Sequence, residues 1–212
     1  MTTVRGWRGR QIPVTVQRSD DHDAPVAVVL PGAGYTPAHP LLHFCGAVLR
    51  SAGLTVYELW WGDTLTGWND VSEPDLHAWL GADTLAAVDA AARYGRPAAV
   101  VTKSLGTLGL SAAAERRPEL AEVPAIWLTP LLRRPVVVRA LAAWRAPALA
   151  AIAERDPVPD GVEPRHLGDR VRSVLTTGTD HALETDDAVA SVEVLRTVLV
   201  EVHTFVRHLD AR

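Results

Sequence analysis

Cysteine is nearly absent from this sequence: Cys45 is the only one, so the chain can form neither an internal disulfide nor a cysteine-based zinc cluster. Long apolar runs are absent too, and no run approaches the roughly 18 residues that a membrane span needs. The first residues carry charge but lack the apolar segment of a secretory signal, so we expect a cytoplasmic protein. A net charge of −4 provides no basic surface for nucleic acid or an anionic membrane.

What the chain does contain is an ordinary globular composition, with 48% hydrophobic and 22% charged residues. This balance excludes a disordered chain, a collagen-like chain and a coiled coil. A length of 212 residues fits one domain, and we expect residues 1–212 to form it.

Apolar runs of strand length alternate with longer amphipathic stretches along the chain. The run Val26–Leu30 is apolar at every position, which is typical of a strand buried on both faces of a parallel sheet. We expect strands at residues 12–16 (an edge strand), 26–30, 54–59, 98–101, 123–128, 148–153 and 171–176, and helices at 40–51, 73–94, 105–116 and 187–208. This alternation predicts an α/β fold with a doubly wound, mostly parallel sheet and helices on both faces. Reactive side chains in such sheets lie in loops at the carboxyl ends of the strands.

Ser104 stands where an expected strand runs directly into an expected helix, in the segment Val101–Thr107. This is the setting of a nucleophile elbow, whose pattern is G-x-S-x-G. Gly106 keeps the second small position, whereas Thr102 replaces the first glycine. The alternative is that Ser104 only caps the helix, as serine often does.

Two further strand ends carry the partners that a serine nucleophile needs. The strand at 148–153 leads to Asp156, and the strand at 171–176 leads to His181. Serine is a weak nucleophile until a base takes its proton, and a carboxylate orients that base and stabilises its charged form. The order Ser104, Asp156, His181 therefore predicts a triad.

With these motifs and the segment Pro31–Tyr35, most of the chain from Val26 onward resembles a small α/β-hydrolase. The resemblance is to the group that includes dienelactone-hydrolase-like proteins and compact serine esterases. It implies Ser104 as nucleophile, His181 as general acid and base, and Asp156 as the orienting carboxylate. Dienelactone hydrolases carry cysteine at the elbow, so their substrate is not carried over to this chain.

The resemblance also implies an oxyanion hole built from two backbone N–H groups, those of Leu105 and Ala33. Larger members of the superfamily insert a lid between the strands at 123–128 and 148–153. The corresponding segment here, 131–147, is short and rich in arginine, so we expect a minimal lid or none. Its arginines are either solvated or face an acidic substrate.

Four residues are candidates for contacting the substrate: Tyr35, Trp60, Trp61 and Lys103. Trp60 and Trp61, together with Trp68, follow the strand at 54–59 and either wall an acyl pocket or pack in the core. Lys103, the only lysine, is either a solvated residue at the rim or a cation that attracts substrate or orients the loop.

Metal and nucleotide sites fit the sequence poorly. His39 and His43 have the spacing of a zinc-protease helix, but Pro40 stands where that motif needs glutamate. The glycines Gly32 and Gly34 lack the third glycine of a dinucleotide loop. We therefore expect no metal and no cofactor.

These features predict a serine hydrolase that cleaves an ester or thioester of a small molecule through an acyl-enzyme. The alternatives are acyl transfer to another acceptor and a non-catalytic protein of the same fold that acts by binding or assembly. The sequence predicts no particular acyl group, leaving group or oligomeric state.

Overall fold

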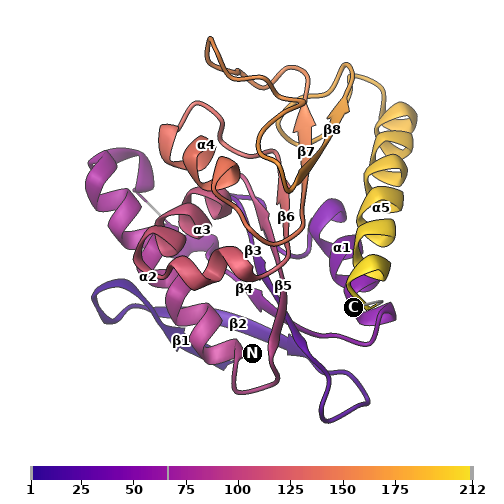
Figure 1. The fold of residues 1–212 in the computed structure, drawn as a ribbon. Coiled ribbons are helices and arrows are strands. Elements are labelled where there is room, and N and C mark those ends of the chain that lie inside the picture. The colour runs from indigo at the N-terminus through magenta and orange to yellow at the C-terminus, as the bar shows by residue number, and fades with distance from the viewer. Residues whose placement is uncertain (1, 66, 211–212) are drawn as a thin grey trace.

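The computed structural model describes residues 2–65 and 67–210. Within them eight strands form one sheet in the order β1-β2-β4-β3-β5-β6-β7-β8 (Figure 1). The strands are β1 (Thr2–Arg5), β2 (Gln11–Gln17), β3 (Val26–Leu30), β4 (Thr55–Leu59), β5 (Pro97–Lys103), β6 (Ala125–Leu128), β7 (Ala148–Ala153) and β8 (Val171–Thr176). The pairs β1–β2 and β2–β4 are antiparallel, and the other neighbouring pairs are parallel.

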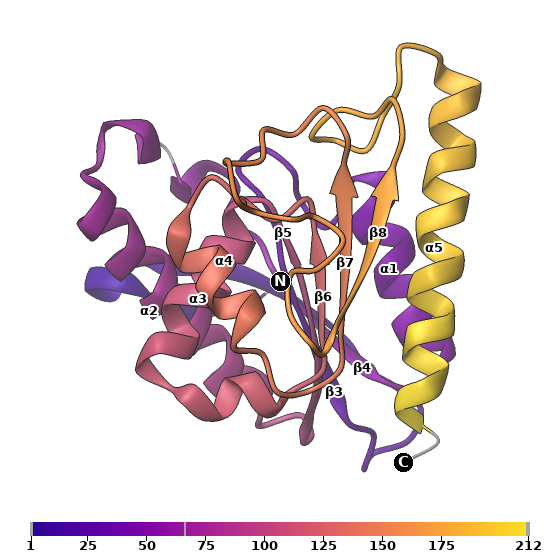
Figure 2. The same cartoon turned by 45° about the horizontal axis from the view of Figure 1, so that its top comes forward.

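Helices cover both faces of this sheet (Figures 1 and 2). On one face α1 packs against α5, and on the other α3 packs against both α2 and α4. The α-helices are α1 (Pro40–Ser51), α2 (Glu73–Ala91), α3 (Leu105–Arg116), α4 (Pro135–Ala142) and α5 (Ala188–Asp210). Short 3₁₀ turns are η1 (Trp7–Gly9), η2 (Gly62–Leu65), η3 (Trp68–Asp70) and η4 (Pro118–Glu122). This architecture confirms the predicted fold class.

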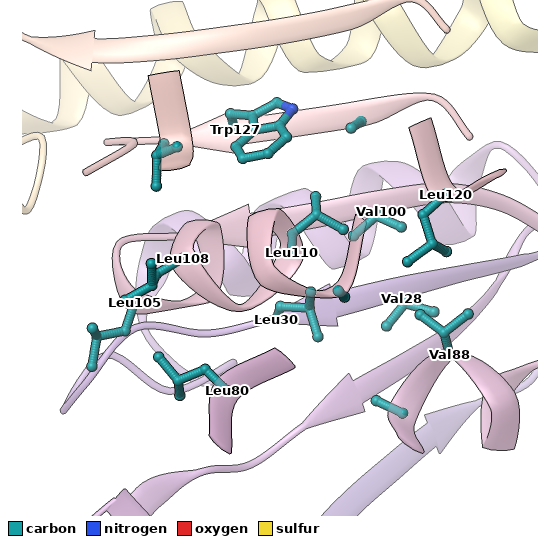
Figure 3. Packing of buried hydrophobic residues seen from close by; sticks show 14 of the residues in the cluster. Val28, Leu30, Leu80, Val88, Val100, Leu105, Leu108, Leu110, Leu120 and Trp127 are labelled. Carbon is teal, nitrogen blue, oxygen red and sulfur yellow. The ribbon is translucent and has the colours of Figure 1, made fainter. Parts of the chain in front are cut away.

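Two apolar clusters, one on each face of the sheet, form the core. Every residue of β3 is buried, and successive side chains go to opposite clusters because side chains alternate across a strand. Val28 and Leu30 join the cluster beneath α2 and α3, part of which is drawn in Figure 3. Ala27 and Val29 join the cluster beneath α1 and α5. The strand β3, which is apolar at every position, is therefore buried on both faces, as the sequence predicted.

One expectation about the edge of the sheet is wrong. The strand at 12–16 is not an edge strand, because β1 pairs along its outer side. The segment 131–147, for which the sequence predicted a minimal lid or none, contains the short helix α4, which packs against α3. No predicted strand or helix is missing, although several ends differ by one to three residues from the expected ranges.

Because β3, β5, β6, β7 and β8 are parallel, their carboxyl ends meet at one edge of the sheet. The loops that leave this edge carry the segments singled out in the sequence. Within the described ranges, every helix is too short or too polar to cross a lipid bilayer.

Candidate active site

Ser104 occupies a sharp turn between β5 and α3. Its backbone has φ 51° and ψ −117°, a conformation that L-residues rarely adopt and that functional turns use. A Cβ atom on Gly106 would lie 2.5 Å from the Leu30 carbonyl oxygen and 2.7 Å from Thr102 Oγ1. The missing side chain at Gly106 therefore leaves room for Thr102 at the position where the elbow pattern has its first glycine.

Gly32 is the second glycine that the elbow requires. A Cβ atom there would lie 3.0 Å from the Cβ of Ser104, closer than ordinary van der Waals contact. The loop after β3 can therefore approach the serine directly.

Ser104, His181 and Asp156 form one hydrogen-bonded chain. The distance from Ser104 Oγ to His181 Nε2 is 2.7 Å, and His181 Nδ1 lies 2.9 Å from each carboxylate oxygen of Asp156. The Asp156 side chain is 13% exposed, whereas that of His181 is 43% exposed. The carboxylate is thus held away from solvent while the imidazole borders the open side of the site.

A tight turn holds the loop that carries His181. The Asp180 carboxylate accepts hydrogen bonds from the backbone N–H groups of Ala182 and Glu184, at 2.8 and 3.1 Å. The backbone N–H of Asp180 donates to the Glu184 carbonyl. Leu183 anchors the turn in the core and has a positive φ of 65°. The position of Asp180 next to His181 is the one signal of this turn that the sequence contains.

The loops that carry Asp156 and His181 are also tied to each other. The backbone N–H of Arg155 donates to the Thr179 carbonyl, and the Arg155 guanidinium makes two hydrogen bonds to the Asp186 carboxylate. These contacts keep the two loops together at the end of β7 and β8.

The backbone N–H groups of Ala33 and Leu105 donate to no other group in the part of the chain that the structure describes. Both residues line the cavity at Ser104. Leu105 is the first residue of α3, so its N–H is one of the unpaired donors at a helix N-terminus. Two donors beside the serine are what an oxyanion would need.

A cavity of about 600 Å³ opens at Ser104. Its apolar lining comes from Ala33, Trp68, Leu105 and Leu131. Its polar lining comes from Ser104, His181, Arg133 and Arg134, and no described carboxylate contributes to it. Arg134 forms an ion pair with Glu73 at 2.8 Å, whereas Arg133 is exposed and has no ion pair among the described residues. The cavity therefore combines an apolar wall with a cationic rim.

Of the three tryptophans expected near the site, Trp68 is the one that lines the cavity. The expectation that Trp61 contacts substrate is wrong, because Trp61 is fully buried and its indole N–H donates to Asp83 in α2. Trp60 is not at the cavity either, because its indole N–H donates to Thr15 in β2. Trp61 belongs instead to the apolar cluster beneath α2 and α3, and the backbone N–H of Trp60 donates to the Pro13 carbonyl in β2.

Tyr35 and Lys103 do not lie where a contact with substrate was expected. Neither is among the residues that line the cavity. The Tyr35 hydroxyl accepts a hydrogen bond from the backbone N–H of Leu41, and burial raises the pKa of this tyrosine to about 12. Lys103 is 1% exposed, so it is neither a solvated rim residue nor a substrate contact.

The arrangement can activate an oxygen nucleophile. A base with a hydrogen bond to Ser104 Oγ can take its proton, and the carboxylate behind that base can stabilise the resulting positive charge. No group of three or more His, Cys, Asp or Glu side chains in the described ranges is placed to hold a metal ion.

Comparisons with solved structures identify the fold. Est1E from Butyrivibrio proteoclasticus superposes with a TM-score of 0.76 at 15% identity over 100% of both chains, and another structure of Est1E has ferulic acid bound. Dienelactone hydrolase from Anabaena variabilis matches with a TM-score of 0.62 at 16% identity over 94% of both chains. A lidless α/β serine hydrolase from Xanthomonas campestris has a TM-score of 0.63 at 17% identity, covering 97% of this chain and 92% of its own.

The chain therefore has the α/β-hydrolase fold in a compact form. No protein-family model matches the sequence, and no curated protein matches it. At identities of 14–18%, the solved structures show the fold and leave the activity to be argued from the site.

Proposed function

We propose that the protein is a serine hydrolase that cleaves an ester or thioester of a small molecule through an acyl-enzyme. The observation that carries the proposal is the hydrogen-bonded chain from Ser104 through His181 to Asp156, with contacts of 2.7 and 2.9 Å. An elbow backbone conformation at Ser104 supports it, because helix capping alone does not require a strained residue.

Acylation follows from this geometry. Ser104 Oγ attacks the carbonyl carbon while its proton passes to His181 Nε2, and the carbonyl oxygen becomes an oxyanion. The N–H groups of Ala33 and Leu105 stabilise that oxyanion. When the carbon–oxygen or carbon–sulfur bond breaks, the proton on Nε2 goes to the departing alcohol or thiol, and the acyl group remains on Ser104.

In deacylation, water takes the place of Ser104 as the nucleophile. His181 takes a proton from water as the water attacks the acyl carbon, and returns it to Ser104 Oγ as the acid leaves. Asp156 holds Nδ1 protonated throughout, so that Nε2 is free to accept. No cofactor enters either step.

The cavity favours small esters that carry an acidic group. Its volume of about 600 Å³ and its open side suit a small or extended substrate, and the short segment between β6 and β7 lines it only with residues that precede α4. Arg133 at the rim has no ion pair among the described residues and can bind a carboxylate or phosphate. Trp68 and Leu131 provide an apolar wall for the acyl or alcohol part.

A panel of nitrophenyl and methyl esters tests the proposal, with acetyl, longer acyl, hydroxycinnamoyl and carboxylate-bearing members. We expect hydrolysis of short or aromatic esters by the wild type and a loss of at least about 10³-fold in Ser104→Ala. Ser111→Ala is the matched control, because Ser111 is a buried serine of α3, the helix that follows Ser104, and its hydroxyl donates to the Thr107 carbonyl. Equal rates in Ser104→Ala and wild type would refute the proposal.

Arg133→Gln tests the preference for acidic substrates separately. We expect kcat/KM to fall by about 3- to 10-fold for carboxylate-bearing esters and to stay unchanged for neutral ones. Arg139→Gln serves as control, since Arg139 is an exposed arginine of α4 that pairs with Glu115 and does not line the cavity.

A further inference from the structure

Lys103 lies in a fully partnered buried position directly beside the nucleophile. Burying an ammonium is unfavourable unless hydrogen bonds replace its water. Here Nζ donates to Thr129 Oγ1 at 2.9 Å and to the backbone carbonyl of His181 at 2.8 Å. It also lies over the ring of Tyr35, 4.5 Å from the ring centroid. Two hydrogen bonds and one aromatic ring therefore replace the water around the buried ammonium.

This site joins the ends of three strands, two of which lead to the serine and the histidine of the candidate triad. Lys103 is the last residue of β5 and precedes Ser104, Thr129 directly follows β6, and His181 lies in the loop after β8. Among the described residues, no other group donates a hydrogen bond to the His181 carbonyl. Lys103 is therefore the direct connection between the elbow and the main chain of the histidine.

The lysine does not act on the serine itself. The hydrogen-bond partner of Ser104 Oγ is His181 Nε2, and the hydrogen bonds of Lys103 go to Thr129 and to the His181 backbone. Lys103 is thus not placed as a base of a Ser–Lys pair. Lys103 can therefore affect catalysis only by changing the position of His181.

We propose that Lys103 is a positioning residue whose ammonium fixes the main chain of His181 and so keeps Nε2 within hydrogen-bond distance of Ser104. The inference rests on the proposed hydrolase function. Placement matters because a shift of about 1 Å in a reacting group can lower a rate about 10²-fold. Without this bond, the main chain of His181 would be held only by the turn at Asp180 and by the contacts with the Asp156 loop, and the 2.7 Å contact would be held less closely.

The positioning role depends on pH because it requires the protonated form of Lys103. Burial is the largest influence and lowers the pKa of Lys103 to about 8, while Asp156, Asp180 and Glu184 act in the opposite direction. The Tyr35 ring faces the ammonium but stays neutral, since its own pKa is raised to about 12. A neutral amine donates a weaker hydrogen bond than an ammonium, so the hold on His181 weakens above about pH 8.

A matched pair of variants tests the proposal with the best ester from the panel. Lys103→Met removes the charge and both hydrogen bonds at similar length, whereas Thr129→Val removes the hydrogen bond to Thr129 and keeps the one to His181. We expect Lys103→Met to lower kcat about 10²-fold with KM changed by less than about threefold. Thr129→Val should lower kcat by at most about threefold.

Two further readouts separate positioning from general stability. Backbone hydrogen exchange in the segment 178–184 should be faster in Lys103→Met than in wild type and unchanged in Thr129→Val. The kcat of wild type should fall above about pH 8, whereas the kcat of Lys103→Met should not show this fall. If Lys103→Met does not fold, Lys103→Gln, which keeps one amide donor, takes its place with a smaller expected loss.

Unchanged kcat and unchanged loop exchange in Lys103→Met would overturn the positioning role. Equal losses of kcat in Lys103→Met and Thr129→Val would also overturn it, because the His181 bond would then not matter. If the wild type hydrolyses no ester, the hydrolase proposal fails, and loop exchange alone decides whether Lys103 holds His181.

Discussion

His181 Nε2 lies 2.7 Å from Ser104 Oγ although the two residues are 77 positions apart in the sequence. The contact exists because β5 and β8 run in the same direction and end at the same edge of the sheet. Lys103 adds a second link between the same two loops through the His181 carbonyl. The loops that carry Ser104 and His181 are therefore linked through both a side-chain and a main-chain contact of His181.

Asp156→Asn should impair ester hydrolysis while leaving the fold intact. Both carboxylate oxygens lie 2.9 Å from His181 Nδ1, and an amide could neither hold the productive tautomer nor stabilise the charged ring. We expect kcat to fall by about 10²- to 10⁴-fold, measured by steady-state kinetics. Asp160→Asn, an exposed change in the same loop, is the control. A variant with more than half of the wild-type kcat would contradict the role given to Asp156.

Gly106→Ala should distort the elbow. The added Cβ atom would meet the Leu30 carbonyl oxygen at 2.5 Å, and backbone cannot move aside cheaply. We expect the free energy of unfolding to fall by about 1–3 kcal/mol in urea titrations, with a loss of esterase activity. The control is Gly46→Ala in α1, where the nearest atom lies at 3.4 Å on the Glu58 carboxylate. Equal stability of both variants would show that the elbow accommodates a side chain at Gly106.

Asp83→Ala should be among the most destabilising single changes. The buried carboxylate accepts hydrogen bonds from the Trp7 backbone N–H and from the indoles of Trp61 and Trp79. Three donors would lose their acceptor, at about 1–3 kcal/mol for each buried group, so we expect a loss of about 3 kcal/mol or more. Urea denaturation measures it, with exposed Asp160→Ala as control. A loss below about 1 kcal/mol would mean that water replaces the carboxylate.

Lys103 should also give stability a characteristic pH dependence. Its pKa is lowered from 10.5 to about 8 in the folded protein, so between these values the unfolded chain binds more protons than the folded one. The unfolding free energy of wild type should therefore rise relative to Lys103→Met from about pH 8 to 9.5, by up to about 1.4 kcal/mol per pH unit. Urea titrations of both proteins across this range measure the difference. A difference independent of pH would mean that the lysine titrates normally.

Much of the fold could be predicted because several of its strands are apolar at every position. The runs 26–30 and 148–153 are apolar throughout, and every one of their residues is buried. The parallel arrangement then made it possible to expect Ser104, Asp156 and His181 at one edge, and the structure brings these three side chains together.

Other features depended on information that short patterns lack. The strand β1 is short and mostly exposed, and only its pairing with β2 makes it a strand. Lysine is rarely buried, so nothing local indicated that Lys103 would have partners from two other loops. Trp61 follows a core strand as a pocket residue would, but it is buried and its indole N–H donates to Asp83 in α2, which lies 22 residues away in the sequence.

The most direct test of the proposed triad is the intact mass of the protein after treatment with a fluorophosphonate, which reacts with activated serines. We expect a single adduct on wild type, none on Ser104→Ala, and much slower labelling of His181→Ala. The hydrogen bond between Ser104 Oγ and His181 Nε2 is the reason for that order. A folded wild type that remains unlabelled, or a Ser104→Ala variant that is labelled as fast as wild type, would contradict it.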